Sequence, residues 1–305
     1  MGRQAISFRD RRVFGPGDWG NMGRYAWDAA IFKLTNRWLE SNWIVGRFIL
    51  HDPDRWPNKW ADGPTAFASY NSIKALPFSL DAFYVFKHDD RGITSGEKGI
   101  GNLASHSLGV WLNDKWQGWE YSITAVGQLG KWGSDDIRAY GLAASLGYQW
   151  QALWQPLLKA QCIIGSGDRN STDGIHGTFD GVFGGADTDL YGWMNIFFWQ
   201  NLREYRLDLK LSPNKALGLK AEYHYFMLDQ AHDAWYFPGK AVRRDKTGSS
   251  GRELGQEIDL TARMKVTSNL EFLTGACFFM PGELVKNTGK SPQASWYFLE
   301  TTFIF

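Results

Sequence analysis

The sequence has 305 residues, with 33 Lys and Arg against 32 Asp and Glu, so its formal net charge is +1. This balance argues against a nucleic-acid-binding protein, which normally carries a basic excess. Aromatic residues make up 16%, including 16 Trp and 12 Tyr, and these two types concentrate where a protein surface passes from lipid to water. There is no run of about 18 apolar residues, so the sequence predicts no transmembrane helix.

Most of the chain consists of segments in which apolar and polar residues alternate. In residues 205–211, Tyr and Leu alternate with Arg206, Asp208 and Lys210. Alternation with period two predicts strands with two different faces. We expect about fourteen strands, at residues 3–9, 25–35, 42–50, 66–74, 78–88, 103–113, 118–130, 137–149, 157–165, 197–211, 217–228, 255–266, 270–280 and 296–305.

A β-sandwich also alternates, but three features favour a membrane-spanning antiparallel β-barrel. The expected strands have about 10 to 13 residues, which suits a tilted crossing. Aromatic residues cluster at strand ends, which is typical of barrel girdles. Short connections also alternate with long ones, as in barrels with short periplasmic turns and long outer loops. The longer connections are expected at residues 10–24, 51–65, 89–102, 166–196, 229–254 and 281–295.

The last strand ends in Phe305, and a terminal aromatic residue after such a strand is typical of outer-membrane barrels. The chain begins Met1-Gly2-Arg3-Gln4, without the basic start and apolar stretch of a signal peptide. Export to the outer membrane requires such a signal. We therefore expect residues 1–305 to form a single outer-membrane barrel domain whose signal peptide and first strands are missing.

The two longest loops are polar and rich in glycine. One of them contains Asp187 and Asp189, and carboxylates in such a loop are ligands that a calcium ion accepts. The alternative is a glycine-rich loop with solvated acids. We expect no other metal site, because the six His residues do not have metal-ligand spacing.

With lipid outside, the polar strand faces line a lumen. The basic residues expected there are Arg3, Arg9, Arg24, Arg47, Lys87, Lys159, Arg206, Lys210, Lys220, Arg263 and Lys265. The acidic residues expected there are Asp28, Asp81, Asp208, Glu222, Glu257, Asp259, Glu271 and Glu300. This mild basic excess is compatible with an anion-conducting pore, since rings of charge set pore selectivity. It is equally compatible with a salt-bridged lumen that plugs the barrel.

Motifs for catalysis are scarce. The G-x-S-x-G motif, which holds the nucleophilic serine of many hydrolases, is absent. Gly165-Ser166-Gly167 does not open a helix as a nucleotide-binding loop would. His224 falls on the inner face beside Glu222, where a hydrogen-bonding role is the simplest interpretation. We expect neither an enzyme nor a bound cofactor, apart from the calcium alternative.

Several stretches together resemble the alginate export family of outer-membrane barrels. They are GRQ (2–4), WGNMGR (19–24), GTFDGVFGGADTDLYGWMN (177–195), YRLDL (205–209), LKAEYHYF (219–226), DAWY (233–236), LGQEIDLTA (254–262), FMPGE (279–283), NTG (287–289) and WYFLETTFIF (296–305). The resemblance covers essentially the whole chain. Each stretch alone is a weak signal, and the set is specific.

The resemblance implies an 18-stranded monomeric barrel, of which this chain would supply the last fourteen strands. It also implies an electropositive, arginine-lined constriction that passes an acidic polysaccharide. By motif, the basic residues of that constriction fall on Arg3, Arg24, Arg206 and Arg263, with Lys220 as a further candidate.

The sequence thus predicts an outer-membrane channel for export or diffusion of an anionic solute, with an alginate-like acidic polysaccharide as the expected substrate. The expected partners are this solute, outer-membrane lipid and periplasmic export proteins, and no nucleic acid. Two alternatives stay open: a general porin, and a structural or adhesive barrel whose outer loops carry the function.

Overall fold

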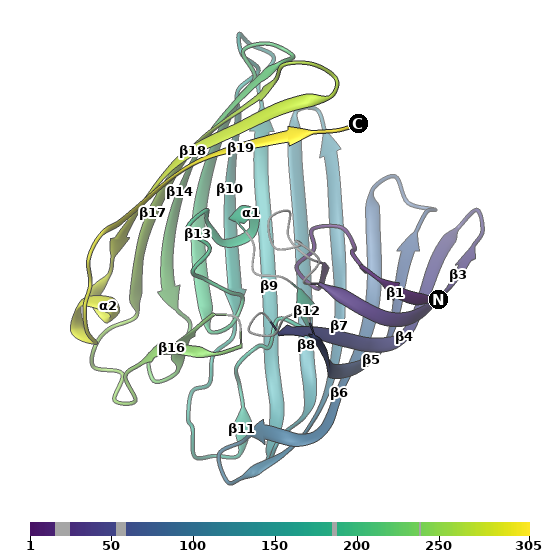
Figure 1. Ribbon diagram of the computed structural model, residues 1–305, viewed down its shortest axis with the longest axis vertical. Coiled ribbons are helices and arrows are strands. Elements are labelled where there is room, and N and C mark those ends of the chain that lie inside the picture. Colours follow the sequence, from purple (N-terminus) through teal and green to yellow (C-terminus); the bar gives the residue numbers. More distant parts are fainter. Residues whose placement is uncertain (16–24, 53–58, 185–187, 238) are drawn as a thin grey trace.

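A computed structural model describes residues 1–15, 25–52, 59–184, 188–237 and 239–305. Its main feature is one large antiparallel sheet that curves around an interior, as Figure 1 shows. Fourteen strands follow one another along this sheet from β1 to β19, each paired with the next along the path. Within the described residues, β1 and β19 do not pair with each other, so the sheet is curved but does not close into a barrel.

The strands of the main path are β1 (Gly2–Gln4), β3 (Ala26–Thr35), β4 (Leu39–Asp52), β5 (Lys59–Ile73), β6 (Ser79–Ser95), β7 (Ile100–Trp116), β8 (Trp119–Trp132), β9 (Asp135–Gln149), β10 (Leu157–Gly165), β13 (Leu202–Leu211), β14 (Leu217–Leu228), β17 (Glu253–Lys265), β18 (Leu270–Pro281) and β19 (Ala294–Phe303). The short strands β2 (Phe14–Gly15), β11 (Ile175–His176), β12 (Phe183–Gly184), β15 (Ala234–Tyr236) and β16 (Ala241–Arg244) lie outside this path. Two helical turns, α1 (Thr188–Tyr191) and α2 (Glu283–Asn287), complete the structure.

All fourteen expected strands have a counterpart in the path, but the described chain contains nineteen strands in total. The five additional strands have two to four residues each, too few for the alternation to reveal them. β6 and β7 are also longer than expected and take up most of residues 89–102, leaving a tight connection at 96–99. Residues 5–9 and 197–201, which we expected to be strand, instead leave the sheet.

Connections differ between the two ends of the sheet. At one end, which we call the turn end, the strands are joined by residues 36–38, 74–78, 117–118, 150–156, 212–216 and 266–269. At the other end, the loop end, the long connections include residues 166–201, 229–252 and 282–293. The expected alternation of short and long connections is therefore present in part, because 96–99 and 133–134 are both short connections at the loop end and 89–102 was expected to be long.

The two faces of the sheet differ as the alternation predicts. On the outer face, Val45, Leu108, Leu207 and Leu299 are exposed hydrophobic side chains, as expected where lipid covers a surface. On the inner face of β13 and β14, by contrast, charged side chains such as Arg206 and Glu222 are buried. None of the described helices is long and apolar enough to span a membrane.

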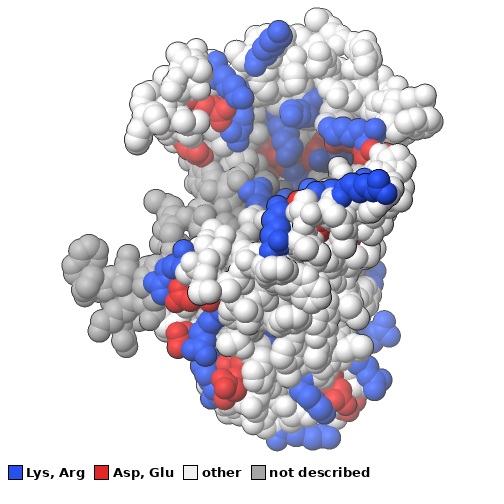
Figure 2. Space-filling model, turned by 90° about the vertical axis from the view of Figure 1, so that its right-hand side faces the viewer, with Lys and Arg blue, Asp and Glu red and all other residues white. Residues whose placement is uncertain are grey.

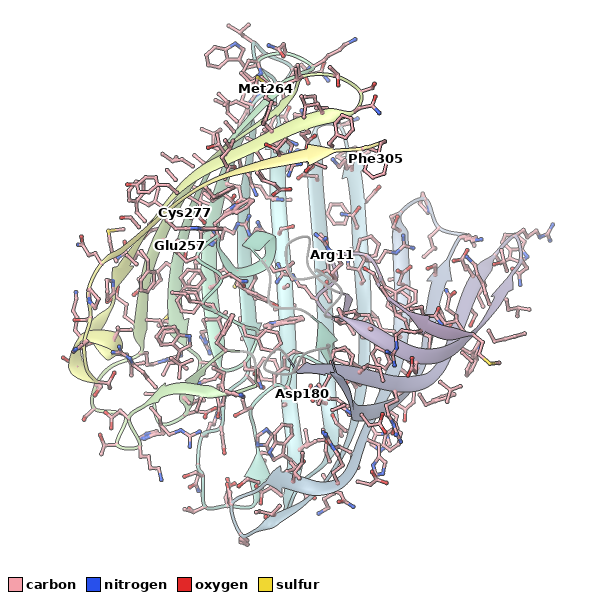
Figure 3. All side chains as sticks on the ribbon, viewed as in Figure 1. Arg11, Asp180, Glu257, Met264, Cys277 and Phe305 are labelled. Carbon is pink, nitrogen blue, oxygen red and sulfur yellow. The ribbon has the colours of Figure 1, made fainter. Side chains whose placement is uncertain are left out.

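The interior is not empty at mid-height. Two segments leave the sheet and fold inward, as Figure 1 shows: the N-segment (residues 5–15) and the inner loop (residues 166–201). They pair through β2 and β12, and the Phe14 and Phe183 rings stack with their centroids 5.7 Å apart. Asp180 lies in the interior in Figure 3 and binds Lys87 of β6, with 3.1 Å between Oδ2 and Nζ.

These inward segments supply much of the hydrophobic core. Phe14, Phe179, Phe197 and Trp199 are completely buried and belong to one cluster with small inner-face residues such as Ala68. Burying a large apolar side chain contributes about 1.5 to 3 kcal/mol. The core therefore lies between the inward segments and the sheet, and it fixes where the inner loop stands.

Candidate functional site

A basic cavity opens on the inner face at the turn end. Its volume is about 540 Å³. Seven basic side chains line it, from β7, β10, β13, β14, β17 and the β13–β14 turn, against one acidic residue: the bases are Lys115, Lys159, Lys210, Lys215, Lys220, Arg263 and Lys265, and the acid is Glu120. Figure 2 shows blue Lys and Arg side chains, with some red Asp and Glu side chains beside them, in the hollow of the upper half of the molecule, which is the turn end.

Strand register places these bases together. Lys210 of β13 lies directly opposite Lys220 of β14, and Arg263 of β17 lies opposite Gly218 of β14. Because side chains alternate between the faces of a sheet, bases two residues apart on one strand point into the same interior. Arg263 and Lys265 meet this condition on β17. The cavity thus follows from the alternation that predicted the strands.

The bases of the cavity differ in how firmly they are paired. Lys220 Nζ lies 2.8 Å from Glu222 Oε1, and Lys115 Nζ lies 2.9 Å from Glu120 Oε2. Arg263 pairs with Glu271 of β18. Within the described chain, Lys210, Lys215 and Lys265 make no ion pair, so these three ammonium groups are available to an anion. At the neutral pH where lysine and arginine are charged, the cavity carries a clear excess of positive charge.

Arg206 lies on the same inner face but outside this cavity. It is 4% exposed, donates to Asp208 at 2.6 Å between Nε and Oδ1, and pairs with Glu222. The neighbouring His224 is completely buried and lies 2.7 Å from Glu204 Oε1. This part of the wall is a salt-bridged network, the second interpretation that the charge pattern allowed for the lumen.

The four predicted path residues that the structure describes therefore lie in different surroundings. Lys220 and Arg263 line the basic cavity, and Lys220 shares Glu222 with the buried Arg206. Arg3 is on β1, at the other edge of the sheet, where it is half exposed and binds both carboxylate oxygens of Asp28 at 2.9 Å. Arg24 lies outside the described residues.

The structure does not describe the side chains of the two predicted calcium ligands. Asp187 lies outside the described residues, and the side chain of Asp189, in α1, is not described either. Over the part of the chain whose placement is described, no group of three or more His, Cys, Asp or Glu side chains is arranged to hold a metal ion.

A second cavity lies at the loop end and has a different charge. Its volume is about 750 Å³. It is lined by Lys87, Arg244 and Lys246, by the imidazoles of His176 and His232, and by Asp89, Glu97, Asp135, Asp168 and Asp233. Acidic side chains outnumber the Lys and Arg side chains here. The polar lining of this cavity comes largely from loops rather than from strand faces.

Two groups of the loop-end cavity titrate unusually. Burial, together with Asp233 and Glu97 nearby, raises the pKa of Asp168 to about 6. Burial lowers the pKa of His176, whose ring stacks on Trp132 with the centroids 4.2 Å apart. The inner loop supplies both Asp168 and His176, and the loop also supplies Trp193 to the basic cavity. It therefore stands between the two cavities.

Sequence reasoning missed two parts of this site. Lys115 and Lys215 lie at or next to turns, where alternation does not indicate which way a side chain points, although both belong to the cavity. The inner loop was expected as an outer loop, and its folding back into the interior was not predicted. Its sequence does carry a signal, since residues 179–199 include six Phe and Trp residues that are at most 8% exposed: Phe179, Phe183, Trp193, Phe197, Phe198 and Trp199.

Comparisons with known proteins agree with this architecture. A family model described as "Alginate export" matches residues 1–297. Among solved structures, the chain is similar to Pseudomonas aeruginosa OccD3 (OpdP), with a TM-score of 0.61 and 12% identity over 99% of this chain and 72% of that one. It is also similar to P. aeruginosa OccK11 (OpdR), with a TM-score of 0.57 and 13% identity over 98% and 76% of the two chains. At these identities the two structures support the fold alone. No curated protein matched.

Proposed function

Given that this chain belongs to the alginate export family, we propose that its basic cavity takes in an anionic polysaccharide of the alginate type and delivers it to the lumen. The chain is a bacterial outer-membrane protein, and its family indicates a channel for an anionic solute rather than an enzyme. In this proposal the turn end faces the periplasm, as short turns do in outer-membrane barrels.

The observation that carries the proposal is the excess of bases in one cavity. Lys210, Lys215 and Lys265 have no ion pair within the described chain, so a carboxylate does not have to displace an internal partner to bind them. Arg263 adds a guanidinium, which offers two parallel N–H donors to a carboxylate. Several weak sites in series let a charged chain move without being trapped.

The substrate path that we propose combines the structure with the family motif. Lys220 and Arg263 belong to it because they line the basic cavity. The motif adds Arg3 and Arg24. Arg206 acts differently in this proposal, since its buried guanidinium holds Asp208 and Glu222 in place. The anion-binding feature that we propose to test is therefore the basic cavity, not a ring of arginines.

Block of ion current by a uronate oligosaccharide tests this proposal in planar bilayers that contain the full-length protein. We expect the oligosaccharide to block the current from the turn-end side. A variant with Lys210, Lys220, Arg263 and Lys265 changed to Gln should lose most of that block. A control variant with Lys98, Lys131, Lys240 and Lys246 changed to Gln removes the same charge at the loop end and should keep it. Equal block in both variants would contradict the proposal.

A barrel with a structural or adhesive role is the second candidate, because the inner loop occupies the interior at mid-height. A general porin would conduct without block by uronates. If the full-length protein gives no current even after residues 177–199 are replaced by a short Gly and Ser linker, the structural role is favoured over a channel.

We also propose that four further strands complete a monomeric, 18-stranded barrel between β19 and β1. The support is physical: the outer edges of β1 and β19 have no strand partner along the described path, and unsatisfied backbone groups are costly in lipid. A preparation of residues 1–305 alone that forms stable pores would contradict this. Periplasmic export proteins are the proposed partners at the turn end.

A further inference from the structure

Three acidic side chains lie directly opposite one another on the inner face of the wall. Strand register pairs Asp208 of β13 with Glu222 of β14, and Glu222 with Asp259 of β17. All three are at most 2% exposed. Like charges directly opposite on neighbouring strands destabilise a sheet, and buried carboxylates require partners. A row of this kind needs an explanation in terms of what it binds.

Cations of the wall satisfy part of the row. Arg206 pairs with Asp208 and Glu222, and Lys220 pairs with Glu222. On the adjacent row of the sheet, His224 lies 3.3 Å from Asp259 Oδ2 through its Nε2. These contacts still leave carboxylate oxygens of Glu222, Asp259 and the neighbouring Glu257 that face the interior.

The inner loop supplies further donors to these three carboxyl groups. The backbone N–H of Trp193 donates to Asp259 Oδ2 at 3.1 Å, and its indole N–H donates to Glu222 Oε2 at 3.1 Å. The backbone N–H of Met194 donates to Glu257 Oε1 at 2.7 Å. Three hydrogen bonds, from two consecutive residues, hold the loop against the wall.

The local backbone is shaped for this contact. Gly192 has a φ of +90°, and a Cβ at this position would lie 2.7 Å from a carboxylate oxygen of Glu257. A side chain there would therefore both strain the backbone and separate the loop from the wall. The N–H of Asn195 donates to the carbonyl of Gly192 at 3.1 Å, which closes residues 192–195 into a tight turn.

This turn contributes Trp193 to the lining of the basic cavity. Trp193 is 8% exposed, belongs to the cavity lining, and packs in one cluster with Leu273 and Cys277 of β18. Its ring stacks on Phe298 of β19, with the centroids 4.9 Å apart. Figure 3 shows Glu257 and Cys277 close together on the wall that the turn contacts. Beyond the turn, the rest of the inner loop leads to the loop-end cavity.

We propose that residues 192–194 form a gate between the two cavities, and that Glu222, Glu257 and Asp259 hold it shut. The inference rests on the proposed channel function. Glu222 and Asp259 of the row, together with the neighbouring Glu257, form the docking surface of the gate, and the N–H groups of the turn bind to it. When the turn moves away, water replaces these donors and hydrates the carboxylates. Because the opposed carboxylates repel one another while they are buried, they raise the free energy of the closed state and so favour opening.

The gate can be tested through a native thiol, without reference to ion current. Cys277 is completely buried beneath Trp193, whereas Cys162 is partly exposed. In full-length protein with Cys162→Ser, a charged methanethiosulfonate reagent should label Cys277 slowly. Trp193→Phe keeps an aromatic ring but loses the N–H donor to Glu222, and Glu257→Ala removes the acceptor for Met194. Each change should raise the labelling rate about tenfold, the effect expected for the loss of one buried hydrogen bond.

Two controls separate gating from general loosening. Glu120→Gln removes a carboxylate that lines the same cavity but does not contact the turn, and Trp154→Phe makes the same aromatic change in the β9–β10 turn. Both should leave labelling unchanged, and the heat-induced unfolding temperature shows whether each variant is folded. Unchanged labelling in folded Trp193→Phe and Glu257→Ala proteins would overturn the gate.

Ion current in the same variants separates this inference from the channel on which it rests. If labelling and open-channel current rise together, the gate is supported. If labelling rises but none of the proteins conducts, the proposed channel fails and the turn is a permanent plug. If wild-type protein conducts and the variants match it in both labelling and current, the channel stands and the gate is wrong.

Discussion

The inner face of β13, β14 and β17 has two halves that the sequence pattern does not distinguish. Towards the loop end, the inner loop covers the face, and Arg206, Glu222 and Asp259 are buried in a network of ion pairs and hydrogen bonds. Towards the turn end the face is uncovered, and bases such as Lys210 and Lys265 line an open cavity. Charge on a strand face is therefore structural or functional according to what covers it.

The largest expected effect is a difference in stability between variants of Arg206, in the covered half, and Arg263, in the uncovered half. Arg206→Ala leaves Asp208 and Glu222 buried without their shared guanidinium, and breaking a buried ion pair on one side costs about 3 to 5 kcal/mol. Arg263→Ala is the matched control, because its pair with Glu271 is more than half exposed on the arginine side and such pairs contribute about 1 kcal/mol or less. Urea unfolding of both variants, followed by Trp fluorescence, measures the two costs. Equal costs would remove the distinction between the halves.

Lys220 lies between the covered and the uncovered half, and its substitution should affect both the stability and the anion selectivity of the protein. Its ammonium contacts Glu222 in the covered half, and the side chain is 31% exposed to the cavity. We expect Lys220→Gln to lower the free energy of unfolding by about 1 kcal/mol, because one partly screened hydrogen bond to a charge is lost. The same variant should conduct anions less selectively. A loss of stability with unchanged selectivity would assign Lys220 to the covered half alone.

Lys210 should show the opposite relation between stability and function. It lies directly opposite Lys220 and has no ion pair in the described part of the chain. Opposed like charges cost a few tenths to about 1 kcal/mol. Lys210→Gln should therefore raise the unfolding free energy by a few tenths of a kcal/mol while it lowers anion selectivity. A destabilised variant would mean that Lys210 has a structural partner.

The smallest expected effect is a pH dependence of the protein's stability that arises from Asp168 at the loop end. Burial and neighbouring carboxylates raise the pKa of Asp168 to about 6. A carboxyl group with a raised pKa stabilises the fold below its unfolded pKa, about 3.9, and this contribution is lost as the pH rises to about 6. Because Asp168 is half-buried, solvent reduces the effect. The unfolding temperature of Asp168→Asn should fall less than that of wild type between pH 4 and pH 7, and parallel curves would contradict this.

Much of this fold could be predicted from sequence because alternation reports local geometry. Residues 157–165 and 217–228 were expected as strands and are β10 and β14 with the same bounds. Alternation also identified the inner face of Lys210 and Arg263. It could not indicate which inner-face residues a distant loop would cover, because that depends on contacts between residues far apart in the chain. Trp193 and Asp259, for example, are 66 positions apart.

The closure of the sheet could not be predicted for a related reason. Period-two alternation defines each strand and its neighbours, whereas closure depends on whether the first and last edges meet. In the described structure β1 and β19 do not pair. The family resemblance placed Arg206 in a constriction, and alternation could not show that its guanidinium would be buried between Asp208 and Glu222.

The central claim is that the uncovered, basic half of the inner face handles the anionic solute. The reversal potential of the full-length protein in a salt gradient across a planar bilayer tests this most directly. We expect an anion-selective potential for the wild-type protein, and a shift towards zero when Lys210, Lys220, Arg263 and Lys265 are changed to Gln. An unchanged reversal potential in that folded variant would contradict the claim.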